Sequence, residues 1–158
     1  MQTFLPYESF RDSAKCLDRQ RLGKQRVEAM QILNALQAGS TSRWRNHPAV
    51  RMWRGYENAL GYYMNVMINE WINRGYKNTM TYYEFQRCNK SIFDIVKYPQ
   101  WLGDDRLYKS HRCNLYRKDP NYYGQFLWGR CDEKAPYWWP VELKNKKMNE
   151  EMRMYWNV

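Results

Sequence analysis

The chain has 158 residues, a hydrophobic share of 44% and a net charge of +10, from 26 Lys and Arg against 16 Asp and Glu. This length suits one domain with a hydrophobic core, and the hydrophobic share excludes an intrinsically disordered chain. The sequence has no apolar run of about 18 residues, which excludes a transmembrane helix, and its first residues lack the apolar core of a signal peptide.

Residue counts indicate what kind of partner the protein binds and in which cellular compartment we expect it. The excess of cations, combined with an aromatic share of 17%, favours nucleic acid, because phosphates attract the cations and unpaired bases stack on the rings. The four cysteines form no CxxC pair and only two histidines are present, which argues against a zinc site. We therefore expect a cytoplasmic protein with reduced thiols and no membrane partner.

Helices dominate the first part of the predicted structure. A short helix is predicted at 8–17, after an extended segment that Pro6 interrupts. The next helix, at 19–37, organises the chain, and Gly39 ends it. Its predicted buried stripe follows helical spacing and consists of Leu22, Ala29, Met30, Leu33 and Leu36.

A longer helix is predicted at 48–74, with Asn46 or His47 at its N-cap and a proline in its first turn. Gly55 and Gly61 lie inside this helix, where they would let another helix pack closely. The predicted buried stripe of the helix consists of Trp53, Leu60, Met64, Met67 and Trp71.

The pattern after residue 75 is less regular. Residues 82–85 fit either a helix or a strand, and residues 91–96 fit one short helix. Ser110 is predicted to cap a helix at 111–118, and an Asp-Pro pair at 119–120 is predicted to begin another.

An aromatic loop at 137–140 and a charged terminal helix, in a tail from about residue 144, complete the chain. The elements together predict an all-α fold, a compact single-domain helical bundle around one long central helix. We expect residues 1–158 to form this one domain, because no repeat or flexible linker divides the sequence.

Two clusters of cations contain no acidic residue. The first consists of Arg19, Arg21, Lys24 and Arg26, and the second lies at 106–118. Two interpretations are open. Either the clusters form a solvated surface, with a Lys24–Glu28 ion pair, or they bind phosphates, with Glu28 or Asp18 as a working carboxylate.

Four sequence blocks, with the initial MQTFLPY, carry a resemblance to a known family. The blocks are LDRQRLGKQRVEA at 17–29, NHPAVRMWRGYE at 46–57, SHRCNLYRKDP at 110–120 and PYWWP at 136–140. They resemble the bacterial and phage branch of the pyrimidine dimer DNA glycosylase family, of the endonuclease V type. The segments that line up with the characterised phage enzyme of that family are 26–27, 56–78 and 101–118.

The resemblance implies an all-helical enzyme that cuts the glycosidic bond of a damaged pyrimidine and then nicks the abasic strand. In this family the N-terminal α-amine attacks the sugar and forms an imine, and a Glu on the second helix assists. The implied partner is double-stranded DNA with a damaged or modified base, with pyrimidine dimers as the family default. We expect a monomer that needs no metal or organic cofactor.

The resemblance also implies the nucleophile. It assigns this role to the α-amine of Met1 or, if the initiator is removed, to that of Gln2. A bulky residue at position 2 usually prevents this removal, which favours Met1. Lys24 is the second candidate, because burial among cations would lower the pKa of its side chain.

The carboxylate is less clearly assigned. Ungapped alignment through Arg26 places Gly23 at the position of the family's catalytic acid. This departure leaves Glu28 or Asp18 as the nearby acids, or no acid at all. His111 is a further catalytic candidate, because it lies within the second cationic cluster.

The remaining cations, polar side chains and rings are expected to contact DNA. The expected DNA-binding residues are Arg19, Arg21, Arg26, Arg45, His47, Arg112, Asn114, Arg117 and Lys118. His47 either caps the helix at 48–74 or lines a pocket. Trp138 and Trp139 either stack on an extruded base or close the core near the C-terminus.

Two other functions fit the same sequence. The first is a non-catalytic nucleic-acid-binding protein on the same scaffold. The second is a hydrolytic glycosylase, in which a carboxylate activates a water molecule and the base leaves without an imine.

Overall fold

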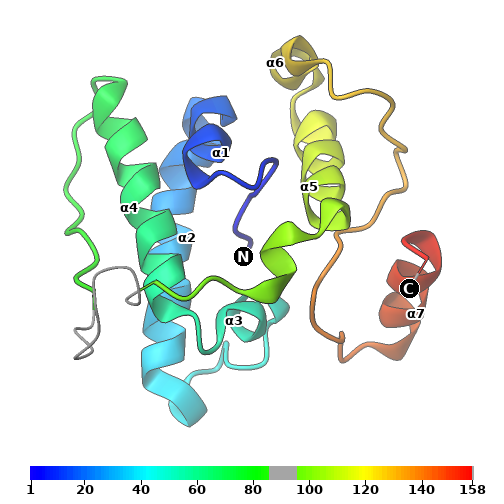
Figure 1. The fold of residues 1–158 in the computed structure, drawn as a ribbon, viewed down its shortest axis with the longest axis horizontal. Helices are drawn as coiled ribbons and strands as arrows, with labels where there is room; N and C mark the ends of the chain where they lie inside the picture. The colour runs from blue at the N-terminus through cyan, green and yellow to red at the C-terminus, as the bar shows by residue number, and fades with distance from the viewer. Residues whose placement is uncertain (86–95, 158) are drawn as a thin grey trace.

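The computed structural model describes residues 1–85 and 96–157, which form helices and loops without a strand (Figure 1). The α-helices are α1 (Phe10–Cys16), α2 (Arg19–Ala38), α3 (Pro48–Trp53), α4 (Glu57–Asn73), α5 (Asp105–Lys118), α6 (Pro120–Tyr123) and α7 (Lys146–Tyr155). Short 3₁₀ turns follow as η1 (Gly39–Thr41), η3 (Gln100–Gly103) and η4 (Gly124–Phe126). The predicted all-α fold is confirmed. No helix in the described ranges is long and apolar enough to cross a lipid bilayer.

The most extensive helix–helix packing in the described residues is between α2 and α4, which lie together on one side of the molecule (Figure 1). Leu22, Ala29 and Ile32 of α2 are fully buried in this contact region, as the helical spacing predicted for the first two. Met30 was predicted in the same stripe, and this was wrong: it is 37% exposed. The polar Gln25 is buried in the stripe instead.

The predicted helix at 48–74 is divided into α3 and α4. His47 caps α3, because its Nδ1 accepts the backbone N–H of Ala49 at 3.1 Å. The chain then turns at Gly55, whose φ of +85° is accessible to glycine and strained for other residues. Gly61 admits the ring of Tyr83 rather than a second helix, since a Cβ at Gly61 would lie 1.9 Å from that ring.

The later helices differ from the prediction at one boundary. Helix α5 begins at Asp105 with Asp104 as its cap, so Ser110 lies inside the helix, buried, and donates its hydroxyl proton to the Leu107 carbonyl. The cap at Asp119, with proline in the first turn of α6, is as predicted, and α7 confirms a terminal helix. Residues 82–85 form neither helix nor strand, and most of the helix predicted at 91–96 lies outside the described residues.

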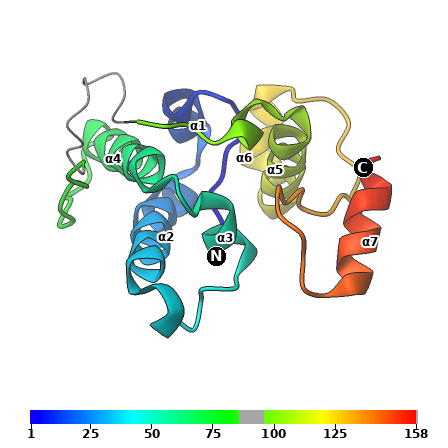
Figure 2. The same ribbon diagram turned by 60° about the horizontal axis from the view of Figure 1, so that its bottom comes forward.

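The first six residues, called here the N-terminal segment, run through the middle of the molecule. Figures 1 and 2 show this segment between the α2–α4 pair and α5. Residues 2–6 are buried, whereas Met1 is only half-buried. The start of the chain is therefore embedded between helices that are far apart in sequence.

Candidate active site

Side chains from the α2–α4 side fix the N-terminal segment. The Phe4 N–H donates to Gln25 Oε1 at 2.9 Å, and the Phe4 carbonyl accepts from the Tyr63 hydroxyl at 2.9 Å. Trp53, at the end of α3, donates its indole N–H to the Thr3 hydroxyl at 3.0 Å. These partners are almost completely buried, so the bonds are shielded from water.

Helix α5 fixes the segment from the opposite side. The Leu5 N–H donates to His111 Nδ1 at 2.8 Å, and Arg112 Nε donates to the Pro6 carbonyl at 2.7 Å. His111 is fully buried, and burial lowers its pKa from 6.5 to about 3. His111 is therefore neutral and holds the backbone. This placement does not support the direct catalytic role predicted for it.

Glu28 of α2 lies at the start of the chain. Its Oε2 accepts the Gln2 N–H at 3.1 Å and a Gln25 Nε2–H at 3.2 Å. The same Gln25 nitrogen donates to the Gln2 carbonyl at 3.1 Å. Among the ion pairs of the described residues there is none between Lys24 and Glu28, so that part of the sequence interpretation was wrong.

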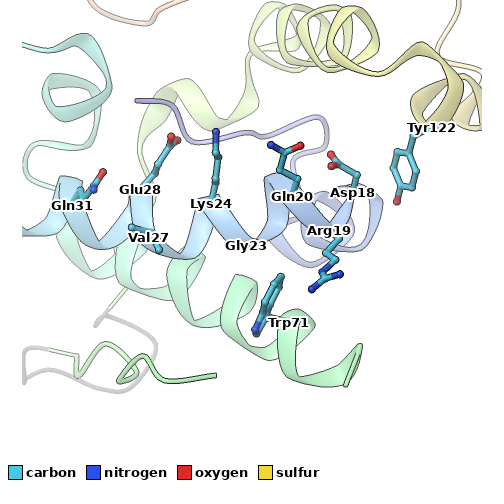
Figure 3. A pocket seen from close by; sticks show the side chains of 10 residues that line it. All are labelled: Asp18, Arg19, Gln20, Gly23, Lys24, Val27, Glu28, Gln31, Trp71 and Tyr122. Atoms are coloured by element: carbon cyan, nitrogen blue, oxygen red, sulfur yellow. The ribbon is translucent and has the colours of Figure 1, made fainter. Parts of the chain in front are cut away.

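Asp18, the other acidic candidate, has structural partners. It caps α2 through the Arg21 N–H, forms an ion pair with the Arg21 guanidinium at 3.3 Å, and accepts the Tyr123 hydroxyl proton. Gly23 faces α4, because a Cβ there would lie 3.1 Å from the Trp71 ring. A carboxylate at position 23 would therefore point away from Glu28's side of the helix (Figure 3).

A shallow groove of about 920 Å³ follows α2 (Figure 3). Its lining residues are Asp18, Arg19, Gln20, Gly23, Lys24, Val27, Glu28, Gln31, Trp71 and Tyr122. Lys24 and Glu28 rise from the same side of the helix in Figure 3. A smaller hollow of about 360 Å³ is lined in part by Met1, Arg43 and Trp44, and Gln31 lines both spaces. The start of the chain is thus next to open surface.

His47 lies within the electrostatic reach of this region. Burial lowers the pKa of His47, the positive chain terminus lowers it further, and the negative charge of Glu28 opposes both. Its ring contacts Trp44 and Trp139 edge-on, with centroid distances of 6.0 and 6.1 Å. Since Nδ1 accepts the capping bond, Nε2 carries the proton of the neutral ring.

Several cations predicted to bind DNA are engaged inside the protein. Arg26 lies over the Trp71 ring at 4.1 Å and donates to Asn78 at 2.9 Å. Arg117 donates to Asn114 at 2.6 Å and to the Ala135 carbonyl at 2.7 Å, which ties the loop before Pro136 to α5. Arg21 and Arg112 are also bonded within the protein, to the Asp18 carboxylate and to the Pro6 carbonyl. These four arginines therefore stabilise the fold. The predicted residues left exposed are Arg19, Arg45 and Lys118.

The two tryptophans of the aromatic loop have different surroundings. Trp138 is buried, and the Arg106 guanidinium covers its ring at 4.3 Å, so it presents no open face for a base; the core-closing alternative fits it. Trp139 is half-buried, and its ring packs against His47 and Tyr137. The ring exposed beside Met1 is Trp44, at 43%, a residue that the sequence patterns did not select.

Metal-ligand geometry is absent from the described ranges, which contain no group of three or more His, Cys, Asp or Glu side chains that could hold an ion.

The sequence model of the family described as pyrimidine dimer DNA glycosylase matches residues 1–84. No curated protein and no solved structure gives a significant match. The matched range contains the N-terminal segment, Gln25, Glu28, His47 and Tyr63, but not the α5 residues that hold the segment from the other side. Because the match covers more than half of its length, the chain belongs to the pyrimidine dimer DNA glycosylase family.

Proposed function

We propose that the protein is a DNA N-glycosylase with AP-lyase activity, which excises damaged or modified pyrimidines from double-stranded DNA. Pyrimidine dimers are the substrate that family membership favours. The observation that carries the proposal is the position of Glu28, whose Oε2 lies 3.1 Å from the backbone nitrogen of Gln2 beside an open groove. A carboxylate that lines an open groove is thus bonded to the backbone of the second residue of the chain.

The chemistry needs a neutral amine and a nearby carboxylate. An α-amine has a reference pKa of about 7.7–8.0, against about 10.4 for a lysine side chain, so α-amines are neutral far more often near pH 7. The amine nitrogen attacks C1′ of the sugar, and the base leaves with the electron pair of the glycosidic bond. Glu28 stabilises the cationic sugar or accepts the proton that the amine loses. The C1′–O4′ bond of the adduct then breaks, the ring oxygen takes up a proton, and the nitrogen lone pair forms the imine, which allows β-elimination of the 3′ phosphate.

Two first residues are compatible with this geometry. If Met1 is retained, its amine is the nucleophile and lies one residue beyond the bond to Glu28. If Met1 is removed, the Gln2 nitrogen that contacts Glu28 becomes the amine itself. Lys24 is the third candidate, because it lines the same groove.

Phosphate contacts would come from the cations that remain on the surface near the groove. Arg19 and Lys24 line the groove, and Arg43 lines the hollow beside Met1. Access to C1′ within a duplex requires a nucleotide to leave the stack, which costs least at a damaged pair. The exposed ring of Trp44 supports this step, since an aromatic ring can stack on an extruded base.

The test combines base release with borohydride trapping on duplexes that carry a pyrimidine dimer or an abasic site. Intact mass spectrometry first establishes the first residue of the purified protein, and peptide mapping of the trapped adduct then identifies the attacking nitrogen. We expect a covalent adduct at the chain terminus that persists in a Lys24→Ala variant. Glu28→Gln should slow base release by roughly 100-fold or more, whereas Glu150→Gln, an exposed control on α7, should not.

The outcomes separate the alternatives. Tight binding without base release or trapping would indicate a non-catalytic nucleic-acid-binding protein. Base release without a trappable adduct would indicate a hydrolytic glycosylase, in which Glu28 activates water. An adduct on Lys24 would move the nucleophile to α2 and leave the reaction class unchanged.

A further inference from the structure

We propose that Gln25 is a positioning residue, which sets the distance between the first residues of the chain and Glu28 and selects the carboxylate oxygen that works on the substrate. This inference rests on the proposed function of the same site. It concerns a side chain that does not touch DNA, because Gln25 is only 1% exposed.

The contacts of the Gln25 amide fix its orientation. Its nitrogen donates to the Gln2 carbonyl at 3.1 Å and to Glu28 Oε2 at 3.2 Å. Its oxygen accepts the Phe4 N–H at 2.9 Å and lies 2.6 Å from the Tyr63 hydroxyl. A carbonyl can only accept and a backbone N–H can only donate, so the amide cannot be flipped without losing both backbone bonds.

An amide at this position is unexpected for packing alone. Position 25 lies in the buried stripe of α2, between Leu22 and Ala29, where an apolar residue would fill the core. A buried amide is costly unless its polar atoms are bonded, and here both the nitrogen and the oxygen have two partners. Three of the partners belong to the site: the backbone of residues 2 and 4, and the carboxylate of Glu28.

The two carboxylate oxygens of Glu28 differ in their hydrogen-bond partners. Oε2 accepts two hydrogen bonds, from the Gln2 N–H and from Gln25 Nε2, whereas Oε1 accepts none from the residues that the structure describes. Because both donors occupy Oε2, a proton taken up by Glu28 goes to Oε1. Glu28 also lines the groove, so Oε1 is the oxygen available to the sugar.

Tyr63 connects the Gln25 amide to α4. Its fully buried hydroxyl lies within hydrogen-bond distance of both Gln25 Oε1 and the Phe4 carbonyl, and its single proton is shared between these acceptors. One amide and one phenol thus connect α2, α4 and the N-terminal segment. A shift of the amide would move the first residues and Glu28 together.

The pH dependence of such a site reflects the titratable groups around Glu28. They include the chain-terminal amine, Lys24 on α2, His47 at the cap of α3, Tyr63 on α4 and Tyr137 in the aromatic loop. A second carboxylate at position 25 would add a negative charge in direct contact with Glu28. This charge would repel the carboxylate of Glu28 at the position where the wild-type amide donates a hydrogen bond.

Gln25→Glu is the sharpest test, because it keeps the shape and the acceptor for Phe4 and Tyr63 but removes the donor to Gln2 and Glu28. We expect single-turnover base release about 10- to 100-fold slower, an unchanged Kd for an abasic duplex, and an acidic limb of the rate profile displaced to higher pH. Gln37→Glu is the matched control, since it adds the same charge at an exposed position near the end of α2.

Gln25→Met is the second variant in case the buried charge prevents folding, and it should slow base release at least about tenfold without a new charge. Circular dichroism and thermal unfolding verify that each variant is folded. A folded variant with the wild-type rate and the wild-type acidic limb overturns the role of Gln25 but leaves the proposed function intact. A wild-type protein without base release or trapping overturns both.

Discussion

The buried His111 predicts a specific loss of stability in mild acid. Its Nδ1 accepts the Leu5 N–H, its ring contacts Phe4 and Tyr137, and burial lowers its pKa to about 3 from an ordinary value of 6.5. The folded protein therefore binds a proton at His111 only in strong acid, whereas the unfolded chain binds one below about pH 6.5. The stabilisation is present above that pH and is lost as the pH falls.

The size of the loss follows from these two pKa values. Between pH 7 and pH 5 the unfolded chain takes up about three-quarters of a proton at this position and the folded chain takes up almost none, which lowers the free energy of unfolding by about 2 kcal/mol. For a domain whose total stability is on the order of 5–15 kcal/mol, that change is easily measured.

The assay is urea unfolding at pH 7, 6 and 5 for the wild type and for His111→Gln, whose amide oxygen can still accept the Leu5 N–H. The variant will be less stable at pH 7. Between pH 7 and pH 5, however, its free energy of unfolding should fall by about 2 kcal/mol less than that of the wild type. Other titrating groups, including His47, are common to both proteins and cancel in the difference. Parallel pH dependences of the two proteins would refute the reasoning that His111 is buried and neutral.

Three further outcomes are expected. Gly61→Ala should destabilise the protein by at least about 1 kcal/mol, because its Cβ meets an aromatic ring, whereas Gly103→Ala, with open space around it, should change stability by less than about 0.5 kcal/mol in thermal unfolding. Lys24→Ala should weaken duplex binding and reduce the slope of log Kd against log salt by about 1 in fluorescence anisotropy, while Arg153→Ala on α7 should not. Arg74→Ala should cost about 2 kcal/mol in urea unfolding, since its guanidinium donates to three carbonyls at the end of α1.

Local signals predicted most of the helices. The spacing of Leu22 and Ala29, the glycine after α2 and the Asp-Pro pair before α6 act within a few residues, so they can be read from the sequence. The prediction was wrong where a glycine lay within a continuous helical pattern of apolar residues. Gly55 was interpreted as a tolerated glycine within one helix, but its positive φ ends α3 and separates it from α4.

The site depended on contacts that sequence spacing does not contain. Gln2 and Glu28 are 26 positions apart, and Leu5 and His111 are 106 apart, so neither pair follows from periodicity. Helical spacing places Gln25 on one polar face with Arg21, Lys24 and Glu28, so its burial could not be predicted from the sequence. The sequence could not show that Arg117 binds a backbone carbonyl of the protein rather than a phosphate, because this depends on which carbonyls the fold brings near it.

The burial of the N-terminal segment has a physical purpose in the proposed reaction. A chain terminus is ordinarily among the most mobile parts of a domain, and a mobile amine would lose most of the rate advantage of being held next to its target. Here the backbone from Gln2 to Pro6 is bonded on one side by α2 and α4 and on the other by α5, while Met1 reaches the surface. The α5 residues lie outside the range that matches the family, yet they hold the same segment as Gln25 does. Weakening either side should therefore slow the chemistry more than it weakens DNA binding, because the amine would be displaced while the surface cations stayed in place.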